Sequence, residues 1–389
     1  MKILIYAHTF APALGGVETI VRVLAEGLQG LRDVESNPPI DVTVVTQTPR
    51  GLMDDATLPF PVVRRPRLLG LIRLVAKADV VHMAGPSFLP LCLALALGRT
   101  VVVEHHGFQV VCPNGQMFHE PSQSLCPGHF MAGRHGECIR CNRKGGVVRS
   151  GKMWAFTFPR RWLSKRVAAN IAPTAWLARV LALPKTVTIH HGLASVPAAS
   201  VFSPSSEPCF ACVGRLVSTK GVRVLLEASG RLRSKGYRFR LKIIGDGPER
   251  NDLMAWARNH GLGQVVEFLG QLPDTQLDET LAGVWALIIP SLAGEVFNLV
   301  AAQSMLPGRM LIVSDLGPLA EVVGEAGLRF APGDSVALAD CMESILLNPG
   351  LARERGNSAR VRAQRLFGEE SMIAEHRAIY SRLGKGPDV

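Results

Sequence analysis

The sequence predicts an α/β protein built from two doubly wound domains. Short apolar runs alternate with amphipathic stretches along its 389 residues, and this alternation pauses once, in a Ser/Pro/Ala-rich segment near residue 200. A chain of this length exceeds a single ordinary core. Continuous apolar strands separated by helices indicate parallel sheets covered on both faces. We therefore expect two Rossmann-like domains facing a central cleft, with ligands beyond the carboxyl ends of the strands.

The individual elements follow from these apolar runs. In the first half we expect a helix at 17–30 and strands at 2–7, 40–46, 80–83, 101–104, 168–172 and 186–190. In the second half we expect helices at 221–235 and 248–259, and strands at 209–214, 240–245, 265–269, 284–290, 311–314 and 327–331. The predicted domains are therefore 1–195 and 209–368, with a linker at 196–208 and a final helix and tail at 369–389.

The positive charge is concentrated in the first half. Residues 1–195 hold 22 Lys/Arg and 11 Asp/Glu, whereas residues 196–389 hold 21 of each. This excess favours an anionic partner, or it reflects an ordinary basic surface. No signal peptide is visible, and the longest apolar stretch, 88–97, is shorter than the roughly 20 residues of a bilayer span. We expect a soluble cytoplasmic protein, at most peripheral to the inner face of the cell membrane.

The most informative segment is 290–305, PSLAGEVFNLVAAQSM. A strand ends at Pro290, a short loop carries Glu295, and a helix is expected to begin near Phe297 or Asn298. The amides of its first turn would form an anion site. These amides belong to Phe297, Asn298, Leu299 and Val300. Glu295 would contact sugar hydroxyls or stabilise positive charge at an anomeric carbon; the alternative is that it caps the helix.

Three further loops suit a phosphate-bearing ligand. Arg215 and Lys220 follow a predicted strand, where two cations suit a diphosphate leaving group, although isolated basic residues are more often solvated surface. Gly245 lies in a strand-to-turn segment, and Gly15 and Gly16 separate the first strand from the first helix. Glycine lets the backbone approach a ligand. The spacing is not G-x-G-x-x-G, which argues against an ordinary dinucleotide site.

Taken together, these stretches resemble the family-4 glycosyltransferases, which are retaining enzymes of the GT-B fold. The resemblance covers nearly the whole chain through the ordered segments GGVE, DVVHMAGP, HHGFQVVCP, APTAWLAR, IHHGL, GRLVSTKG, IIGDGPER and VEFLGQL. It implies transfer of a hexose from a UDP- or GDP-sugar to a saccharide or lipid-linked acceptor, in cell-envelope or exopolysaccharide biosynthesis. It implies no cofactor for catalysis; Asp54 and Asp55 lie in a polar loop and form no Asp-x-Asp metal motif.

The resemblance also assigns roles in donor binding. Arg215 and Lys220 would bind the diphosphate, and the backbone near Leu272 would contact the base. Glu295 would be the first glutamate of the family's E-x7-E motif, whose second position is Gln303 here. A glutamine keeps an acceptor oxygen for the ribose but loses the charge, and charged hydrogen bonds contribute roughly 1.5–3 kcal/mol against about 1 for neutral ones. We therefore expect weaker donor binding.

Two further positions depend on the resemblance. His106 matches the family's histidine near the anomeric centre, and the adjacent His105 is the alternative. Asn298 stands where the family often has glycine, and would crowd the phosphate or sugar. The helix at 369–383, with Tyr380, resembles the family's final helix.

The alternative to an enzyme is a non-catalytic GT-B protein that binds a nucleotide sugar or a protein partner, and the observation that motivates it is Gln303.

A cysteine-rich insert occupies 112–141. Cys112, Cys126, Cys138 and Cys141 end in a C-x2-C pair, which indicates a structural zinc site. Alternative ligands are His119, His129 and His135. The competing interpretation is a loop of free thiols with Cys112 buried.

A basic and aromatic stretch follows at 143–166. Arginines and lysines alternate there with Trp154, Phe156, Phe158 and Trp162, as suits an anionic membrane surface or a lipid-linked acceptor. The alternative is a helix whose aromatics belong to the core. Nucleic acid is not an expected partner, because no recognised binding module accompanies the charge.

Overall fold

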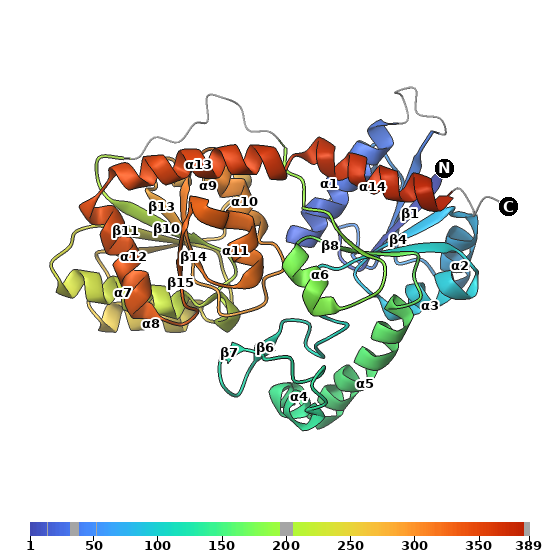
Figure 1. Ribbon diagram of the computed structural model, residues 1–389, viewed down its shortest axis with the longest axis horizontal. Coiled ribbons are helices and arrows are strands. Elements are labelled where there is room, and N and C mark those ends of the chain that lie inside the picture. Colours follow the sequence, from blue (N-terminus) through green and yellow to red (C-terminus); the bar gives the residue numbers. More distant parts are fainter. Residues whose placement is uncertain (14, 32–38, 52, 195–204, 385–389) are drawn as a thin grey trace. The chain divides into compact units, whose positions relative to one another are not determined.

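The computed structural model describes residues 1–13, 15–31, 39–51, 53–194 and 205–384 (Figure 1). The chain forms two compact units. Unit 1 comprises 1–116, 128–194 and the final segment from Phe367, and unit 2 comprises 117–127 and 195–366. Most of the predicted linker, and the tail 385–389, lie outside the described residues. The boundary with the final segment lies two residues before the expected 368/369 boundary, and 117–127 groups with unit 2.

Unit 1 contains a seven-stranded parallel sheet in the order β3-β2-β1-β4-β5-β8-β9. Its strands are β1 (Lys2–Ala7), β2 (Asp41–Thr46), β3 (Val62–Arg64), β4 (Val80–Ala84), β5 (Thr100–Glu104), β8 (Ala169–Ala172) and β9 (Thr186–Thr188). Its helices are α1 (Gly16–Gly30), η1 (Asp55–Thr57), α2 (Leu68–Lys77), α3 (Phe88–Ala96), α4 (His135–Cys141), η2 (Arg143–Gly145), α5 (Val147–Ser164), α6 (Ala175–Leu181) and α14 (Glu369–Gly384). The strand order reverses between β1 and β4.

Unit 2 contains a six-stranded parallel sheet in the order β12-β11-β10-β13-β14-β15. Its strands are β10 (Cys209–Val213), β11 (Arg240–Ile244), β12 (Val266–Gly270), β13 (Ala286–Ile289), β14 (Met310–Ser314) and β15 (Leu328–Phe330), with the separate antiparallel hairpin β6 (Phe118–His119) and β7 (Ser124–Leu125). Its helices are η4 (Ser218–Lys220), α7 (Val222–Ser234), α8 (Arg250–Asn259), α9 (Asp274–Leu281), α10 (Leu299–Met305), α11 (Gly317–Val323), η5 (Gly324–Ala326), α12 (Ser335–Leu347) and α13 (Gly350–Leu366). Here the order reverses between β10 and β13.

The predicted strands all form, with ends shifted by at most two residues. Each sheet is apolar because both of its faces carry helices: every residue of β4, β13 and β14 is buried. Burying a single Leu, Ile or Phe side chain stabilises a fold by about 1.5–3 kcal/mol, so these strands anchor the two cores. Among the residues that the structure describes, none of the helices has the length and apolarity that a bilayer crossing requires.

The chain returns to unit 1 after α13 through backbone pairing. The Leu193 amide donates to the Phe367 carbonyl at 2.8 Å, and Leu193 and Gly368 form a parallel bridge. This pairing explains why Phe367 and Gly368 belong to unit 1, and it sets the start of α14.

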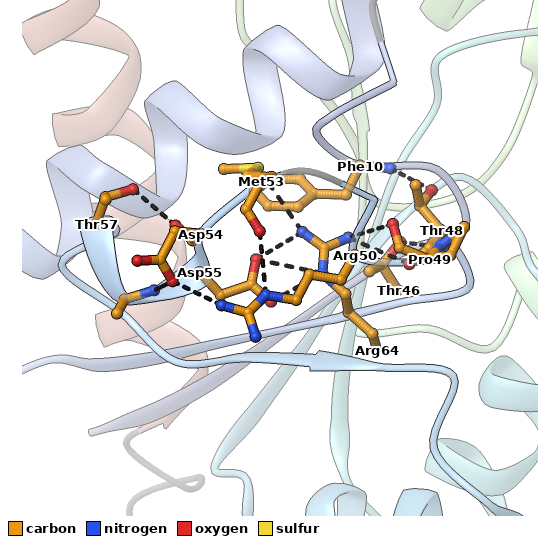
Figure 2. Close-up of polar contacts among 11 residues, drawn as sticks. Phe10, Thr46, Thr48, Pro49, Arg50, Met53, Asp54, Asp55, Thr57 and Arg64 are labelled. Atoms are coloured by element: carbon orange, nitrogen blue, oxygen red, sulfur yellow. Dashed lines mark hydrogen bonds and ion pairs between the residues drawn. The ribbon is translucent and has the colours of Figure 1, made fainter.

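A polar network fixes the loop after β2 (Figure 2). Arg64, at the end of β3, donates to both carboxylate oxygens of Asp55 at 2.7 and 2.9 Å and to the Thr48 carbonyl at 3.2 Å. Arg50 pairs with Asp54 at 2.7 Å. Arginines therefore hold both carboxylates of this acidic pair. The Arg64 hydrogen bonds are the main reason that the pKa of Asp55 lies below its usual value.

Candidate active site

The strand order of unit 2 places two loops side by side. The loop after β10 carries Arg215 and Lys220, and the loop after β13 carries Ser291 and Glu295; ligands of doubly wound sheets bind where the order reverses, between such strands. The Leu292 amide donates to the Thr219 carbonyl at 2.8 Å and ties the loops together.

Glycine at position 221 is what allows this close approach. Gly221 has a φ of 63°, and a Cβ there would collide with the carbonyl of Pro290. Only glycine combines that backbone conformation with that contact.

Lys220 and Glu295 form an ion pair between these loops. The Lys220 Nζ lies 2.6 Å from the Glu295 Oε1, and the Ser291 hydroxyl donates to the same oxygen at 2.6 Å. The Glu295 side chain is 5% exposed. Burial by itself raises the pKa of Glu295, but Lys220 and the Ser291 hydrogen bond outweigh it and hold this pKa below the usual value. The carboxylate is thus ionised and fixed in one position at neutral pH.

A pocket opens beside this pair. It is lined by Gly214, Arg215, Lys220, Pro290, Ser291 and Asn298, among others. Three of the residues predicted to bind the donor therefore line one pocket: Arg215, Lys220 and Asn298. Two cations at a small polar pocket suit a phosphate-bearing ligand.

Helix α10 begins at Leu299, one or two residues later than expected. Its N-cap is Asn298, whose Oδ1 accepts the Ala301 amide at 2.8 Å, so Glu295 is not the cap. Asn298 has a φ of 76°, and asparagine tolerates this left-handed conformation better than most residues. That conformation explains how asparagine fits where the family often has glycine. Phe297 is buried, and Leu299 and Val300 are half-buried.

Three other predicted donor residues lie in unit 2. Gly245 has a φ of 134°, and a Cβ there would collide with the Gly214 carbonyl, so this glycine brings the loops after β10 and β11 together. Leu272 follows β12 and is half-buried, and Gln303 is exposed on α10. Leu272 and Gln303 are not among the residues that line the pocket, and their contacts with the base and the ribose stay predictions.

In unit 1, Gly15 and Gly16 join β1 to α1. Gly15 is the N-cap in an extended conformation, and both glycines are exposed. They stand at the reversal of strand order between β1 and β4, where a ligand has access to the backbone.

The two adjacent histidines after β5 differ in their surroundings. The His105 Nε2 lies 2.9 Å from the Asn170 Oδ1, and Asn170 donates from Nδ2 to two carbonyls, so His105 donates to Asn170 and links β5 to β8. The His106 Nε2 lies 3.6 Å from the Glu104 Oε2. Burial lowers the pKa of His106 to about 4, although Glu104 opposes the shift. His105 is committed to the sheet, so the geometry favours His106 for the predicted catalytic role.

Sequence reasoning missed Glu104 and its neighbours. The carboxylate is fully buried at the end of β5, with His82 Nε2 at 3.2 Å and His191 Nε2 at 3.4 Å. Burial by itself raises the pKa of Glu104, but His106 and the other rings hold it well below the usual value. The signal was present in the sequence: a charged residue ends the apolar run VVVE directly before two histidines.

The four cysteines of the insert are buried thiols. Asn114 lies between two of them: its Oδ1 is 2.9 Å from the Cys112 Sγ, and its Nδ2 is 3.5 Å from the Cys141 Sγ. Cys138 lies with Cys141 on α4, whereas Cys126 follows β7. Zinc binding by this insert stays a prediction.

The basic and aromatic stretch forms α5. Trp154 and Phe158 belong to an aromatic cluster with Phe130 and His135, with ring centroids 4.8–5.7 Å apart. Trp162 is 53% exposed, with the Arg166 guanidinium stacked on it. Trp154 and Phe158 of this helix therefore pack against other aromatic rings, whereas Trp162 lies on the surface.

Comparison with known proteins bears on this site. Residues 198–362 match the family described as "Glycosyl transferases group 1". The matched segment lies within unit 2. Over 176 residues the chain is 33% identical to the glycogen synthase of Mycobacterium tuberculosis. This aligned region covers 45% of this chain and 42% of the relative. Over 240 residues it is 29% identical to the phosphatidyl-myo-inositol mannosyltransferase of Mycobacterium leprae. That aligned region covers 58% of this chain and 61% of the relative. The chain thus spans less than two thirds of either relative.

The solved structure of Anabaena HepE in complex with UDP-glucose superposes with a TM-score of 0.71 over 98% of this chain and 100% of that one, at 17% identity. The likeness extends over both units, and the predicted GT-B fold is confirmed. The predicted resemblance to glycosyltransferases is confirmed as well, while the assignment to family 4 stays a prediction.

Proposed function

We propose that this protein is a retaining glycosyltransferase that uses a UDP- or GDP-sugar and needs no metal for catalysis. The observation that carries the proposal is the pocket of the group 1 domain, which Arg215 and Lys220 line and where Lys220 pairs with the fixed, ionised Glu295. The complex of HepE with UDP-glucose supports a nucleotide-sugar donor.

The reaction follows from these side chains. The bond between the anomeric carbon and the donor diphosphate breaks, and Arg215 and Lys220 neutralise the charge that develops on the diphosphate. The acceptor oxygen forms its bond to the anomeric carbon on the same face, and its proton passes to the departing phosphate. Glu295 binds sugar hydroxyls and stabilises the positive charge of the transition state. His106 contributes a neutral imidazole near the anomeric centre.

The proposed acceptor is a saccharide or a lipid-linked saccharide of envelope or exopolysaccharide assembly, at the inner face of the cell membrane. The exposed Phe156 and Trp162 on α5, together with the basic residues around them, support contact with an anionic surface. Sedimentation with vesicles of neutral and anionic lipid tests this contact, and binding that ignores lipid charge contradicts it.

The test of the function begins with calorimetry of the full chain against UDP-, GDP- and ADP-sugars at low salt. Transfer of the labelled sugar from the donor that binds, with NMR of the product's anomeric proton, then tests retention. Inversion at the anomeric carbon contradicts the mechanism.

A second candidate is a non-catalytic GT-B protein that binds a nucleotide sugar, and the uncharged Gln303 is the observation that favours it. Donor binding without transfer or hydrolysis is the outcome that supports this candidate.

A further inference from the structure

Unit 1 contains a cluster of buried side chains that the proposed reaction does not use. His82 on β4, Glu104 on β5 and His376 on α14 meet in the interior, and none of the three side chains is exposed. The His82 Nε2 lies 3.2 Å and the His376 Nε2 3.7 Å from the Glu104 Oε2. Elements far apart in the sequence therefore aim three potential ligand atoms at one point.

These atoms have no hydrogen-bond partners among the described residues. This applies to the Nε2 of His82, the Nε2 of His376 and both carboxylate oxygens of Glu104. A buried carboxylate without hydrogen bonds or a counter-charge is strongly unfavourable, and buried polar groups in native proteins are nearly always satisfied. The cluster therefore calls for a positive charge at this point, either a bound cation or a proton on one of the surrounding rings.

The hydrogen bonds on the far side of the two rings bear on which nitrogen faces Glu104 with a lone pair. The His376 Nδ1 lies 2.8 Å from the Met372 carbonyl, which only accepts, so this Nδ1 carries the proton. A neutral His376 then presents a lone pair at Nε2. The His82 Nδ1 lies 2.8 Å from the Tyr380 hydroxyl, and His82 presents a lone pair at Nε2 in the tautomer whose Nδ1 donates to this hydroxyl. Metal-binding histidines are typically held by such an outer partner on the second nitrogen.

The spacing also suits a metal ion. Zinc bonds to nitrogen and carboxylate oxygen of about 2.0–2.2 Å place neighbouring ligands of a tetrahedron roughly 3.3–3.5 Å apart. The observed separations of 3.2 and 3.7 Å bracket this value, and the three ligand atoms all lie within 4.8 Å of one another.

We propose that His82, Glu104 and His376 bind a divalent transition-metal ion. Two imidazoles and a carboxylate suit zinc and its neighbours in the first transition row rather than magnesium or calcium. The ion links α14 to the sheet of unit 1 through β4 and β5. His106 and His191 lie 3.6 and 3.4 Å from the same carboxylate, so the ion also sets the position of Glu104 beside His106.

A proton is the competing occupant, because a protonated imidazole beside Glu104 would pair with its carboxylate. The 3.7 Å separation at His376 exceeds the usual 2.7–3.2 Å of a hydrogen bond from nitrogen to oxygen and favours the larger ion, whereas the 3.2 Å separation at His82 also permits a hydrogen bond.

The experiment is metal analysis of the full chain, purified without a polyhistidine tag and reconstituted with Zn²⁺. X-ray absorption at the zinc edge separates this site from the cysteine insert, because nitrogen and oxygen ligands lie at about 2.0–2.2 Å and sulfur at about 2.3 Å. The expected result is a stoichiometric metal ion with nitrogen and oxygen ligands. Zinc bound through sulfur alone, or no bound metal, overturns the proposal in favour of the proton.

Variants test the ligands. His376→Gln and Glu104→Gln are expected to lose this metal ion, and His260→Gln, on the surface of unit 2, is the matched control that keeps it. Tyr380→Phe removes only the outer partner of His82, and is expected to weaken metal affinity about 10–100-fold. If the ligand variants fail to fold, Tyr380→Phe and the absorption spectrum of the wild type decide. Metal affinity unchanged in Tyr380→Phe, or metal retained in folded His376→Gln, contradicts the assignment.

Discussion

Replacing Glu295 with glutamine separates chemistry from stability at the proposed site. The change keeps the size of the side chain and an acceptor for Ser291, but removes the charge that lies 2.6 Å from the Lys220 Nζ. A unit charge about 4 Å from a developing positive charge contributes about 4 kcal/mol at an effective dielectric constant of about 20. Loss of one such preorganised group costs about 10²–10³-fold in kcat. We expect a fall of that size.

The expected loss of folding stability is smaller. A charged hydrogen bond contributes about 1.5–3 kcal/mol and a neutral one about 1, so the variant loses about 0.5–2 kcal/mol of its free energy of unfolding. Water also solvates Lys220, whose side chain is 26% exposed.

The assay is transfer of labelled sugar at saturating donor, with thermal unfolding of the same preparations. Glu343→Gln is the matched control, because Glu343 forms an exposed pair with Lys235 at 2.7 Å in the same unit. We expect this control to turn over like the wild type. Normal turnover in Glu295→Gln, with the fold intact, refutes the catalytic assignment of Glu295.

Three further predictions use other residues. Gln303→Glu is expected to tighten donor binding several-fold by calorimetry, since each 1.4 kcal/mol is about tenfold; unchanged affinity removes Gln303 from the ribose site. Asp55→Asn is expected to lower the Tm at neutral pH, because the depressed pKa of Asp55 stabilises the fold above the unfolded-state value. This stabilisation is lost as the pH falls through the folded-state pKa, so the two Tm values should converge in acid, and a gap that ignores pH contradicts the role of the Arg64 pair. Cys138→Ser is expected to lower the Tm and to remove sulfur-bound zinc, and a wild type without such zinc ends that hypothesis.

The sequence was informative wherever a local pattern determines the structure. Apolar runs such as residues 310–314 form strands because a sheet covered on both faces buries every side chain. The segments around Lys220 and Glu295 were singled out because charged residues directly after buried strands must lie at one edge of the sheet. The role of Asn298 as the N-cap was harder to predict, because its left-handed conformation and the hydrogen bond that it accepts from the Ala301 amide depend on where α10 begins.

The sequence by itself determined two doubly wound units, the loops that carry Arg215, Lys220 and Glu295, and the resemblance to glycosyltransferases. Only the tertiary structure paired Lys220 with Glu295 and distinguished the surroundings of His105 from those of His106. Only the tertiary structure brought His376 to Glu104, across more than two thirds of the chain. The physical reason is that periodicity reports which face of an element is buried, whereas a contact between distant side chains depends on strand order, and no local pattern encodes that order.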